Sequence, residues 1–234
     1  MNSDQAISRL RGCQGFLLDL DGTLYVDSVP VPGAKEFLAH LRGRGVPHLF
    51  LTNNSSARAE TYRQRLLGLG IEAEPDQVLT SGLATMDYLL NKTPHRSAYM
   101  VGTPELEQEF RDGGVDLDAP DPDCLVVGFD TTLTYAKLER ATAMLFDGKP
   151  YFATHPDRTC ITGRGLIPDI AAIIAGLEAV TGRAPQIIGK PEQPIVQAAV
   201  DRLGTTMETT AMVGDQLDTD MTMARAYGLC GILV

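Results

Sequence analysis

Residues 15–23 read Gly-Phe-Leu-Leu-Asp-Leu-Asp-Gly-Thr, a short apolar run that ends in two aspartates, a glycine and a threonine. Continuous apolar runs that stop at polar residues are typical of strands buried inside a parallel sheet. Two aspartates this close repel each other, so they share a proton or hold a cation between them. Gly22 permits a tight turn and a close approach of the backbone to a ligand. The segment therefore predicts a buried strand that ends at a carboxylate site.

The same pattern, an apolar run that ends in polar residues, recurs later in the N-terminal part of the chain and again near its C-terminus. The apolar run 46–51 leads to Thr52-Asn53-Asn54-Ser55-Ser56, and a helix is expected after Gly33. Towards the C-terminus, the runs 185–188 and 211–213 lead to Lys190 and Asp215, with helices expected around 195–203 and 219–227 and a last run at 229–234. Strands alternating with helices predict an α/β fold with a Rossmann-like parallel-sheet core.

The middle of the chain contains enough strand and helix units for a core of its own. Strands are expected at 98–101, 125–127 and 151–153, and helices after Thr103-Pro104, at 134–146 and at 170–180, with a loop rich in proline and glycine before the last helix. We therefore predict a discontinuous core domain at 1–80 and 184–234, with an α/β domain inserted at 81–183.

Composition excludes several classes of protein. The 234 residues are 44% apolar and carry a formal net charge of -10, which excludes a largely disordered chain and argues against binding to a nucleic-acid polymer. No apolar run approaches the ~18 residues of a membrane span, and the first 15 residues lack the apolar segment of a signal peptide. These features predict no membrane attachment and a cytoplasmic location. The scattered cysteines and histidines predict neither a zinc site nor a disulfide.

Polar side chains concentrate where the predicted strands end. The carboxyl ends of parallel strands meet at one edge of a sheet, so we expect Asp19 and Asp21, Thr52 and Asn53, Lys190, and Asp215 with Asp218 and Asp220 to lie at that edge. Each alone is also explained as a turn residue. Together, carboxylate oxygens favour Mg²⁺, the lysine offers a compact cation that balances their charge, and hydroxyl and amide groups hold phosphoryl oxygens. The set predicts phosphoryl transfer, in which a carboxylate is able to act as the nucleophile.

At these four segments the chain resembles the haloacid dehalogenase-like superfamily of phosphatases. The matching stretches are Asp-Leu-Asp-Gly-Thr at 19–23, Leu-Thr-Asn-Asn-Ser at 51–55, Gly-Lys-Pro-Glu at 189–192 and Gly-Asp-Gln-Leu-Asp-Thr-Asp at 214–220. In the middle, His-Pro-Asp at 155–157 and Gly-Arg-Gly-Leu-Ile-Pro at 163–168 resemble the NagD-like branch, which includes p-nitrophenylphosphatases. That branch carries a large cap domain between the second and third motifs.

The resemblance implies a role for each matching residue of the core. Asp19 would attack phosphorus and bind magnesium. Asp21 would protonate the leaving oxygen, activate water, and bind the metal through its backbone carbonyl; its presence excludes dehalogenation. Lys190 would neutralise Asp19 and the phosphate, Asp215 would bind magnesium, and Asp220 would support the site from just outside.

For the substrate, the resemblance implies that Thr52 and Asn53 hold the phosphoryl group with Asn54 close by, and that Asp157 and Arg164 are candidate contacts. The sequence thus predicts a magnesium-dependent phosphatase that acts on a small phosphorylated metabolite through an aspartyl-phosphate. Two alternatives stay open: a phosphotransferase or mutase, and a noncatalytic protein that binds a phosphate ligand. Dimerisation through the cap, common among proteins of this branch, is also implied.

Overall fold

The computed structural model describes residues 3–163 and 165–234, so the candidate contact Arg164 lies outside the described residues. The chain divides into two compact units. The first unit comprises Met1–Thr52, Glu60–Leu79 and Lys190–Val234, and the second comprises Asn53–Ala59 and Thr80–Gly189. No helix in the described parts of the chain is long and apolar enough to cross a membrane.

The first unit is built on a five-stranded sheet in the order β13-β12-β1-β4-β5. Its strands are β1 (Gly15–Leu18), β4 (His48–Thr52), β5 (Val78–Thr80), β12 (Thr210–Gly214) and β13 (Cys230–Leu233). The central strand β1 pairs in parallel with both β4 and β12, and all of its residues are buried. Burial on both faces is the reason why the run before Asp19 is apolar at every position. The predicted parallel-sheet α/β core is confirmed.

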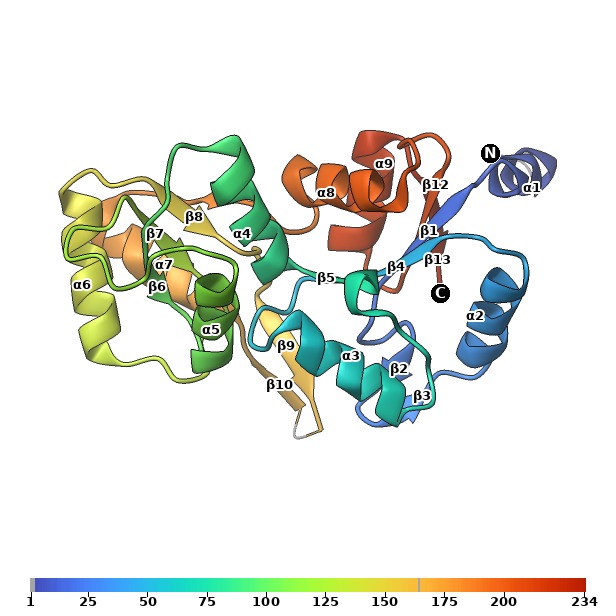
Figure 1. Ribbon diagram of the computed structural model, residues 1–234, viewed down its shortest axis with the longest axis horizontal. Coiled ribbons are helices and arrows are strands. Elements are labelled where there is room, and N and C mark those ends of the chain that lie inside the picture. The colour runs from blue at the N-terminus through green and yellow to red at the C-terminus, as the bar shows by residue number, and fades with distance from the viewer. Residues whose placement is uncertain (1–2, 164) are drawn as a thin grey trace. The chain divides into compact units, whose positions relative to one another are not determined.

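Helices and short turns complete the first unit. They are α1 (Ser3–Arg11), α2 (Ala34–Gly43), α3 (Ala59–Gly68), α8 (Gln193–Leu203), α9 (Thr222–Tyr227), a 3-10 turn at Pro75–Gln77, a π-helical turn at Leu217–Met221, and the two-residue strands β2 (Tyr25–Val26) and β3 (Val29–Pro30). Helices α8 and α9 lie side by side (Figure 1). The helix predicted at 219–227 is in part wrong, because the π-helical turn comes first and α9 begins only at Thr222.

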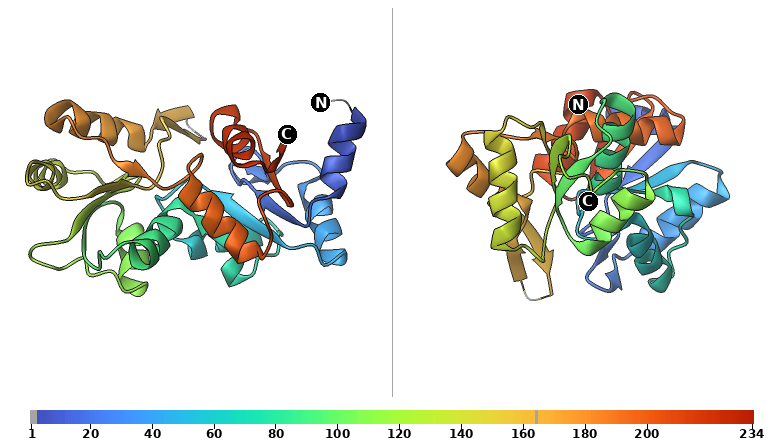
Figure 2. Two further views of the ribbon diagram at one scale, coloured as in Figure 1. Left: turned by 90° about the horizontal axis from the view of Figure 1, so that it is seen from above. Right: turned by 60° about the vertical axis from the view of Figure 1, so that its left-hand side comes forward.

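The second unit has a parallel four-stranded sheet in the order β11-β8-β7-β6. Its strands are β6 (Ala98–Val101), β7 (Cys124–Val127), β8 (Tyr151–Ala153) and β11 (Gln186–Ile187), and its helices are α4 (Ser81–Lys92), α5 (Pro104–Asp112), α6 (Tyr135–Phe146) and α7 (Ile170–Thr181). Helices α6 and α7 pack on one face of the sheet, and α4 and α5 lie on the other (Figure 2). The hydroxyl of Thr103 accepts a hydrogen bond from the Leu106 backbone N–H, as its predicted place before α5 requires.

Two expectations about the second unit are wrong in detail. The run at 185–188 was expected in the core, but β11 pairs with β8, and the backbone N–H of Ile188 donates to Ala153 O at 3.1 Å. The segment expected as a loop contains β9 (Thr159–Thr162) and β10 (Gly165–Pro168), which pair as an antiparallel hairpin. An apolar run does not identify the strand with which it pairs, and proline is compatible with a strand that lacks a second neighbour.

Candidate active site

The site begins at the turn that follows β1. The backbone N–H of Asp19 donates to Val213 O at 3.0 Å, which extends the pairing between β1 and β12 by one residue. The chain then turns at Gly22, whose φ is +90° and whose N–H donates to Tyr25 O at 2.9 Å. A Cβ on Gly22 would lie 2.4 Å from Asp215 Oδ2, so only glycine allows this approach. The turn therefore brings the backbone against the carboxylate at the end of β12.

A buried lysine joins carboxylates that are far apart in the sequence. Lys190 Nζ donates to Asp19 Oδ1 at 2.6 Å and to Asp220 Oδ1 at 2.7 Å, and all three side chains are buried. Carboxylate oxygens of Asp19, Asp215 and Asp220, which we call the acidic cluster, lie within 4.8 Å of one another. The structure thus brings together four of the residues that the sequence placed at this edge of the sheet.

The π-helical turn sets the position of Asp220. Its Oδ2 accepts a hydrogen bond of 3.2 Å from the backbone N–H of Gln216, and the residue has no exposed surface. A Cβ on Gly214 would lie 2.1 Å from the same oxygen. Asp220 therefore fills space that the absent side chain of Gly214 leaves, and both of its carboxylate oxygens are hydrogen-bonded. Single π-helical turns inside helices are frequent at functional sites.

Burial and charge act in opposite directions on the titrating groups of the cluster. Burial raises the pKa of Asp19 to about 7, with Asp220 and Asp215 adding to the rise and Lys190 opposing it. Burial acts to lower the pKa of Lys190, but the charges of Asp19 and Asp220 raise it overall. The lysine therefore stays protonated, and Asp19 is the group whose ionised form is destabilised by burial and by the neighbouring carboxylates. A cation beside Asp19 would stabilise that ionised form.

Asp21 lies in a different environment from Asp19. It is half-buried, and its Oδ1 lies 3.9 Å from a guanidinium nitrogen of Arg65 on α3. The rings of Tyr25 and Tyr62 have their centroids 5.8 and 5.9 Å from the Arg65 guanidinium carbon. Burial raises the pKa of Asp21, with Arg65 opposing it. A partly exposed carboxyl group with a raised pKa is suited to exchanging protons, and Asp19 is held instead by Lys190.

The polar segment after β4 spans the boundary between the two units. Thr52 is the last residue of β4 in the first unit, and Asn53 belongs to the second unit. Asn53 Nδ2 donates to Asp157 Oδ1 at 3.0 Å, so these two candidates meet within the second unit. Asn54 Oδ1 accepts from the backbone N–H of Ser56 at 3.0 Å, which closes a local turn.

Thr23 and Arg65 were not among the predicted site residues. Thr23 Oγ1 lies 3.2 Å from Asp215 Oδ1 and 3.4 Å from Asp19 Oδ2, and it is buried. Its place in the sequence, two residues after Asp21, is the signal that could have identified it. Arg65 has no such signal, because it lies on a helix that no motif marks and reaches Asp21 only through the fold.

Two groups of aspartate and histidine side chains in the described residues have the spacing of metal ligands. The acidic cluster offers oxygen atoms only, which suits a hard divalent cation. The second group is His155, Asp157 and Asp169 in the second unit. There both ring nitrogens of His155 lie within hydrogen-bond distance of protein side chains, Nδ1 at 2.9 Å from Thr154 Oγ1 and Nε2 at 3.1 Å from Asp169 Oδ1. The acidic cluster is therefore the better candidate.

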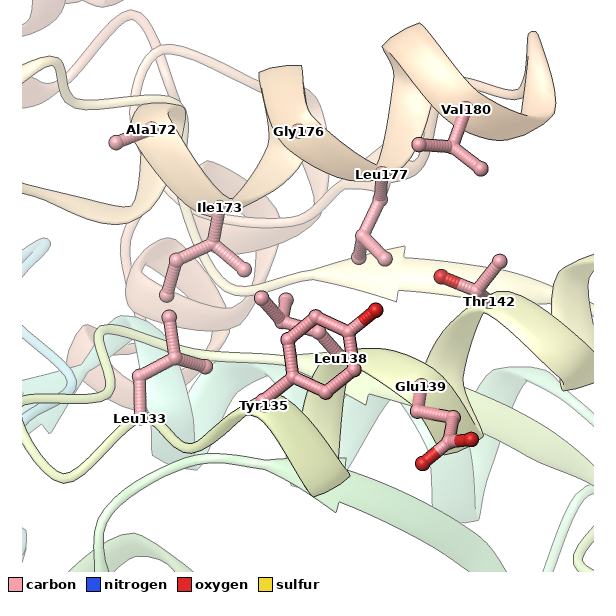
Figure 3. A pocket seen from close by; sticks show the side chains of 10 residues that line it. All are labelled: Leu133, Tyr135, Leu138, Glu139, Thr142, Ala172, Ile173, Gly176, Leu177 and Val180. Carbon is pink, nitrogen blue, oxygen red and sulfur yellow. The ribbon is translucent and has the colours of Figure 1, made fainter.

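A groove of about 400 Å³ on the second unit holds none of the predicted site residues. It lies between α6 and α7, and the side chains that line it, such as Tyr135, Leu138, Ile173 and Leu177, are mostly apolar (Figure 3). Nothing in its lining provides the clustered charges that phosphoryl transfer requires.

Gly22→Ala should reduce both stability and activity, because it combines backbone strain with displacement of Asp215. Gly33→Ala is the matched control, since Gly33 has a φ of +88° in the same unit and no atom within 4 Å of an added Cβ. We expect Gly33→Ala to lower the unfolding free energy by about 1–3 kcal/mol, and Gly22→Ala to exceed it. Urea unfolding of both variants measures the difference, and equal losses would contradict the contact with Asp215.

Comparisons with known proteins agree with this geometry. A family model described as "Haloacid dehalogenase-like hydrolase" matches residues 16–116, and a second one for HAD-like hydrolases matches residues 187–234. The chain is 39% identical over 209 residues to the acid sugar phosphatase of Staphylococcus aureus strain USA300, covering 89% of this chain and 81% of that protein.

Solved structures give the same result. The 4-nitrophenylphosphatase of Thermotoga maritima matches with a TM-score of 0.92 and 40% identity, covering 96% of this chain and 87% of that one. NagD from E. coli K-12 matches with a TM-score of 0.87 and 33% identity, covering 95% of this chain and 87% of that one. Sequence and fold agree over nearly the whole chain, and this protein therefore belongs to the haloacid dehalogenase-like hydrolases, as a NagD-like phosphatase.

Proposed function

We propose that this phosphatase hydrolyses small phosphate monoesters with magnesium bound at the acidic cluster, and that it does so through an aspartyl-phosphate. The observation that carries the proposal is the buried contact of Lys190 with Asp19 and Asp220 beside Asp215. One cation among three carboxylates, of which Asp19 and Asp220 are buried and Asp215 is partly exposed, leaves an excess of negative charge, which a divalent cation would balance.

The residues present fit magnesium. Mg²⁺ prefers oxygen ligands and binds through one or two carboxylates together with water and phosphate oxygens. Asp19 and Asp215 are the side chains that would hold the ion, with the backbone carbonyl of Asp21. Asp220 has no exposed surface and would support the site through its hydrogen bonds with Lys190 and Gln216. When bound, the ion supplies charge neutralisation for the transferring phosphoryl group.

The chain's own residues would divide the reaction into two steps. In the first, a carboxylate oxygen of Asp19 forms a bond to phosphorus while the bond to the leaving oxygen breaks, and Asp21 donates a proton to that oxygen. In the second, Asp21 takes a proton from water, whose oxygen attacks phosphorus and releases Asp19 and inorganic phosphate. Thr52 and Asn53, with Asn54 nearby, would hold the phosphoryl oxygens throughout, and Lys190 would neutralise Asp19.

The second unit would act as the cap that selects the leaving group. We place the cap within residues 80–189, and not at the predicted 81–183, because the strand at Gln186–Ile187 pairs with β8. We give Asp157 and Arg164 the role of substrate contacts. The names of the relatives, an acid sugar phosphatase and a 4-nitrophenylphosphatase, support a small substrate of the sugar-phosphate type. Nucleoside monophosphates and phosphoglycolate are the next candidates. A cytoplasmic location and a dimer formed through the cap complete the proposal.

Removal of the metal should abolish turnover. We expect release of phosphate from 4-nitrophenyl phosphate and from a panel of sugar phosphates, nucleoside monophosphates and phosphoglycolate in Mg²⁺, and a loss of at least about 1000-fold in EDTA, because charge neutralisation contributes several kcal/mol to the transition state. Restoring Mg²⁺ should restore the rate, and a rate that survives EDTA would contradict the role given to the acidic cluster. Product analysis in the presence of a sugar acceptor tests for phosphotransfer, which would appear as a new phosphorylated sugar.

A further inference from the structure

A buried set of polar side chains in the second unit takes no part in the mechanism above. His155, Thr154, Ser81 and Ser55 have no exposed surface, and Asp169 is 5% exposed. Burying polar groups is unfavourable unless each finds a hydrogen-bond partner, and buried networks of this kind fix a single arrangement of the chain. The hydrogen bonds of this set determine which segments it holds in place.

Each hydrogen bond of the set has a defined donor and a defined acceptor. Asp169 Oδ1 accepts from the backbone N–H of Ile170 at 2.6 Å and lies 3.1 Å from His155 Nε2. An ionised carboxylate only accepts, so Nε2 carries the ring proton and Nδ1 accepts from Thr154 Oγ1 at 2.9 Å. The hydroxyl of Thr154 in turn accepts from Ser55 Oγ at 2.9 Å.

Ser55, at the other end of this series of hydrogen bonds, also has a partner for each role of its hydroxyl group. Ser55 Oγ accepts from the backbone N–H of Phe129 at 3.0 Å, which leaves its own proton for Thr154. In this arrangement each hydroxyl proton of Ser55 and Thr154 is donated once. A proton on Nδ1 would leave one of these two buried hydroxyls without an acceptor within the set, which is unfavourable. The set therefore specifies the ring with its proton on Nε2.

The set holds the segments next to the phosphate-binding residues. Ser81 Oγ donates to the backbone carbonyl of Asn53 and lies 3.3 Å from His155 Nδ1. The backbone N–H of Gly189 donates to Thr154 O at 2.7 Å. A Cβ on Gly189 would lie 2.7 Å from Asn53 Oδ1 and 3.0 Å from His155 Cβ, so these groups are packed tightly. Asn53 follows Thr52, and Gly189 precedes Lys190.

We propose that His155 is a positioning residue, which fixes Asn53 and Gly189 through Thr154 and Ser81 and so sets the affinity of the enzyme for the phosphoryl group. The proposal rests on the proposed function, because it takes Thr52, Asn53 and Lys190 as phosphate-binding groups. His155 acts through its Nδ1 side, since that side faces Thr154 and Ser81. Its Nε2 lies 3.1 Å from Asp169 Oδ1, on the other side of the ring.

Two amide substitutions separate the two sides of the ring. The amide oxygen of asparagine occupies a place near His Nδ1, and that of glutamine a place near Nε2, so His155→Asn keeps the acceptor for Thr154 and His155→Gln does not. We expect His155→Gln to raise KM and the inhibition constant of inorganic phosphate about tenfold, and His155→Asn to raise them less than about threefold. Ser81→Ala, which removes the donor to Asn53, should resemble His155→Gln. In all three, kcat should change less than about threefold.

Thr134→Ala is the matched control, because Thr134 caps α6 in the same unit and is not part of the set. It should lower the melting temperature and leave the phosphate constants unchanged. Equal effects of His155→Asn and His155→Gln, or no effect of either in folded protein, would overturn the proposal. Binding of inorganic phosphate measured by calorimetry makes the same comparison without turnover, so a wild-type protein that hydrolyses none of the esters would count against the proposed function alone. Should His155→Gln fail to fold, Ser81→Ala and the ¹⁵N shifts of the wild-type His155 ring decide, with a proton on Nδ1 counting against the proposal.

Discussion

Asp19→Asn is expected to lose at least about 10⁴-fold of the phosphatase rate, because the amide that replaces the carboxylate is no longer a nucleophile. The substitution preserves the size and shape of a side chain that is 5% exposed and packed against Lys190 and Thr23. Initial rates with 4-nitrophenyl phosphate at saturating Mg²⁺ measure the loss. A rate within about tenfold of the wild type would show that Asp19 is not the nucleophile.

The same substitution should not destabilise the metal-free protein at neutral pH. Burial raises the pKa of Asp19 from its ordinary value of 3.8 to about 7, so between these values the folded state keeps a proton that the unfolded state has lost. The unfolding free energy of the metal-free wild type therefore falls as pH rises from about 4 to 7. An amide does not titrate, so in Asp19→Asn this slope should be smaller, and at pH 7 the variant should be at least as stable. Urea unfolding in EDTA across this pH range tests the sign.

Lys190→Met is expected to be the most destabilising single substitution in the site. It removes the cation that Asp19 and Asp220 share and leaves two buried carboxylates without it, which costs about 3–5 kcal/mol of unfolding free energy. Phosphatase activity should fall with it, because the charge that balances Asp19 and the phosphate is lost. Part of the stability should return at acidic pH, where the carboxylates accept protons.

Lys137→Met is the control for Lys190→Met. Lys137 Nζ lies 2.6 Å from Asp130 Oδ2, an ion pair in the second unit whose acidic partner is fully buried. Its loss should reduce stability and leave kcat for 4-nitrophenyl phosphate largely unchanged. Full phosphatase activity in Lys190→Met, or an equal loss of kcat in Lys190→Met and Lys137→Met, would contradict a specific role for Lys190 in the reaction.

Much of the site could be predicted because its reactive residues lie in short segments of the sequence. Asp19 and Asp21 lie two residues apart at the end of an apolar run, and Lys190 and Asp215 follow similar runs. The parallel strands β1 and β12 bring their carboxyl ends to one edge of the sheet, so the apolar runs before Asp19 and Asp215 were enough to predict that these two residues meet. The same reasoning placed Lys190 at this edge, although the strand before it pairs with β8 in the second unit. The contacts of Lys190 at 2.6 and 2.7 Å agree with that prediction.

Other features depend on which segment packs against which, and the local pattern does not contain that information. The strand at Gln186–Ile187 looks like a strand of the core, yet its hydrogen-bond partner is β8. The hairpin of β9 and β10 was hidden by its glycines and prolines, because pairing between two exposed strands leaves no run of buried apolar residues. Arg65 reaches Asp21 only through the placement of α3.

The sequence by itself determined the α/β class, the parallel core and the identity of the reactive groups, because the periodicity of apolar residues and the chemistry of Asp, Lys and Thr are local properties. The tertiary structure alone decided the pKa shifts of those groups and their hydrogen-bond partners. Burial raises the pKa of Asp19, and the approach of Lys190 balances the charges of Asp19 and Asp220. It also decided that His155 joins Asp169 to the segment at Asn53, since the desolvation and hydrogen bonding of a side chain depend on residues that lie far from it in the chain.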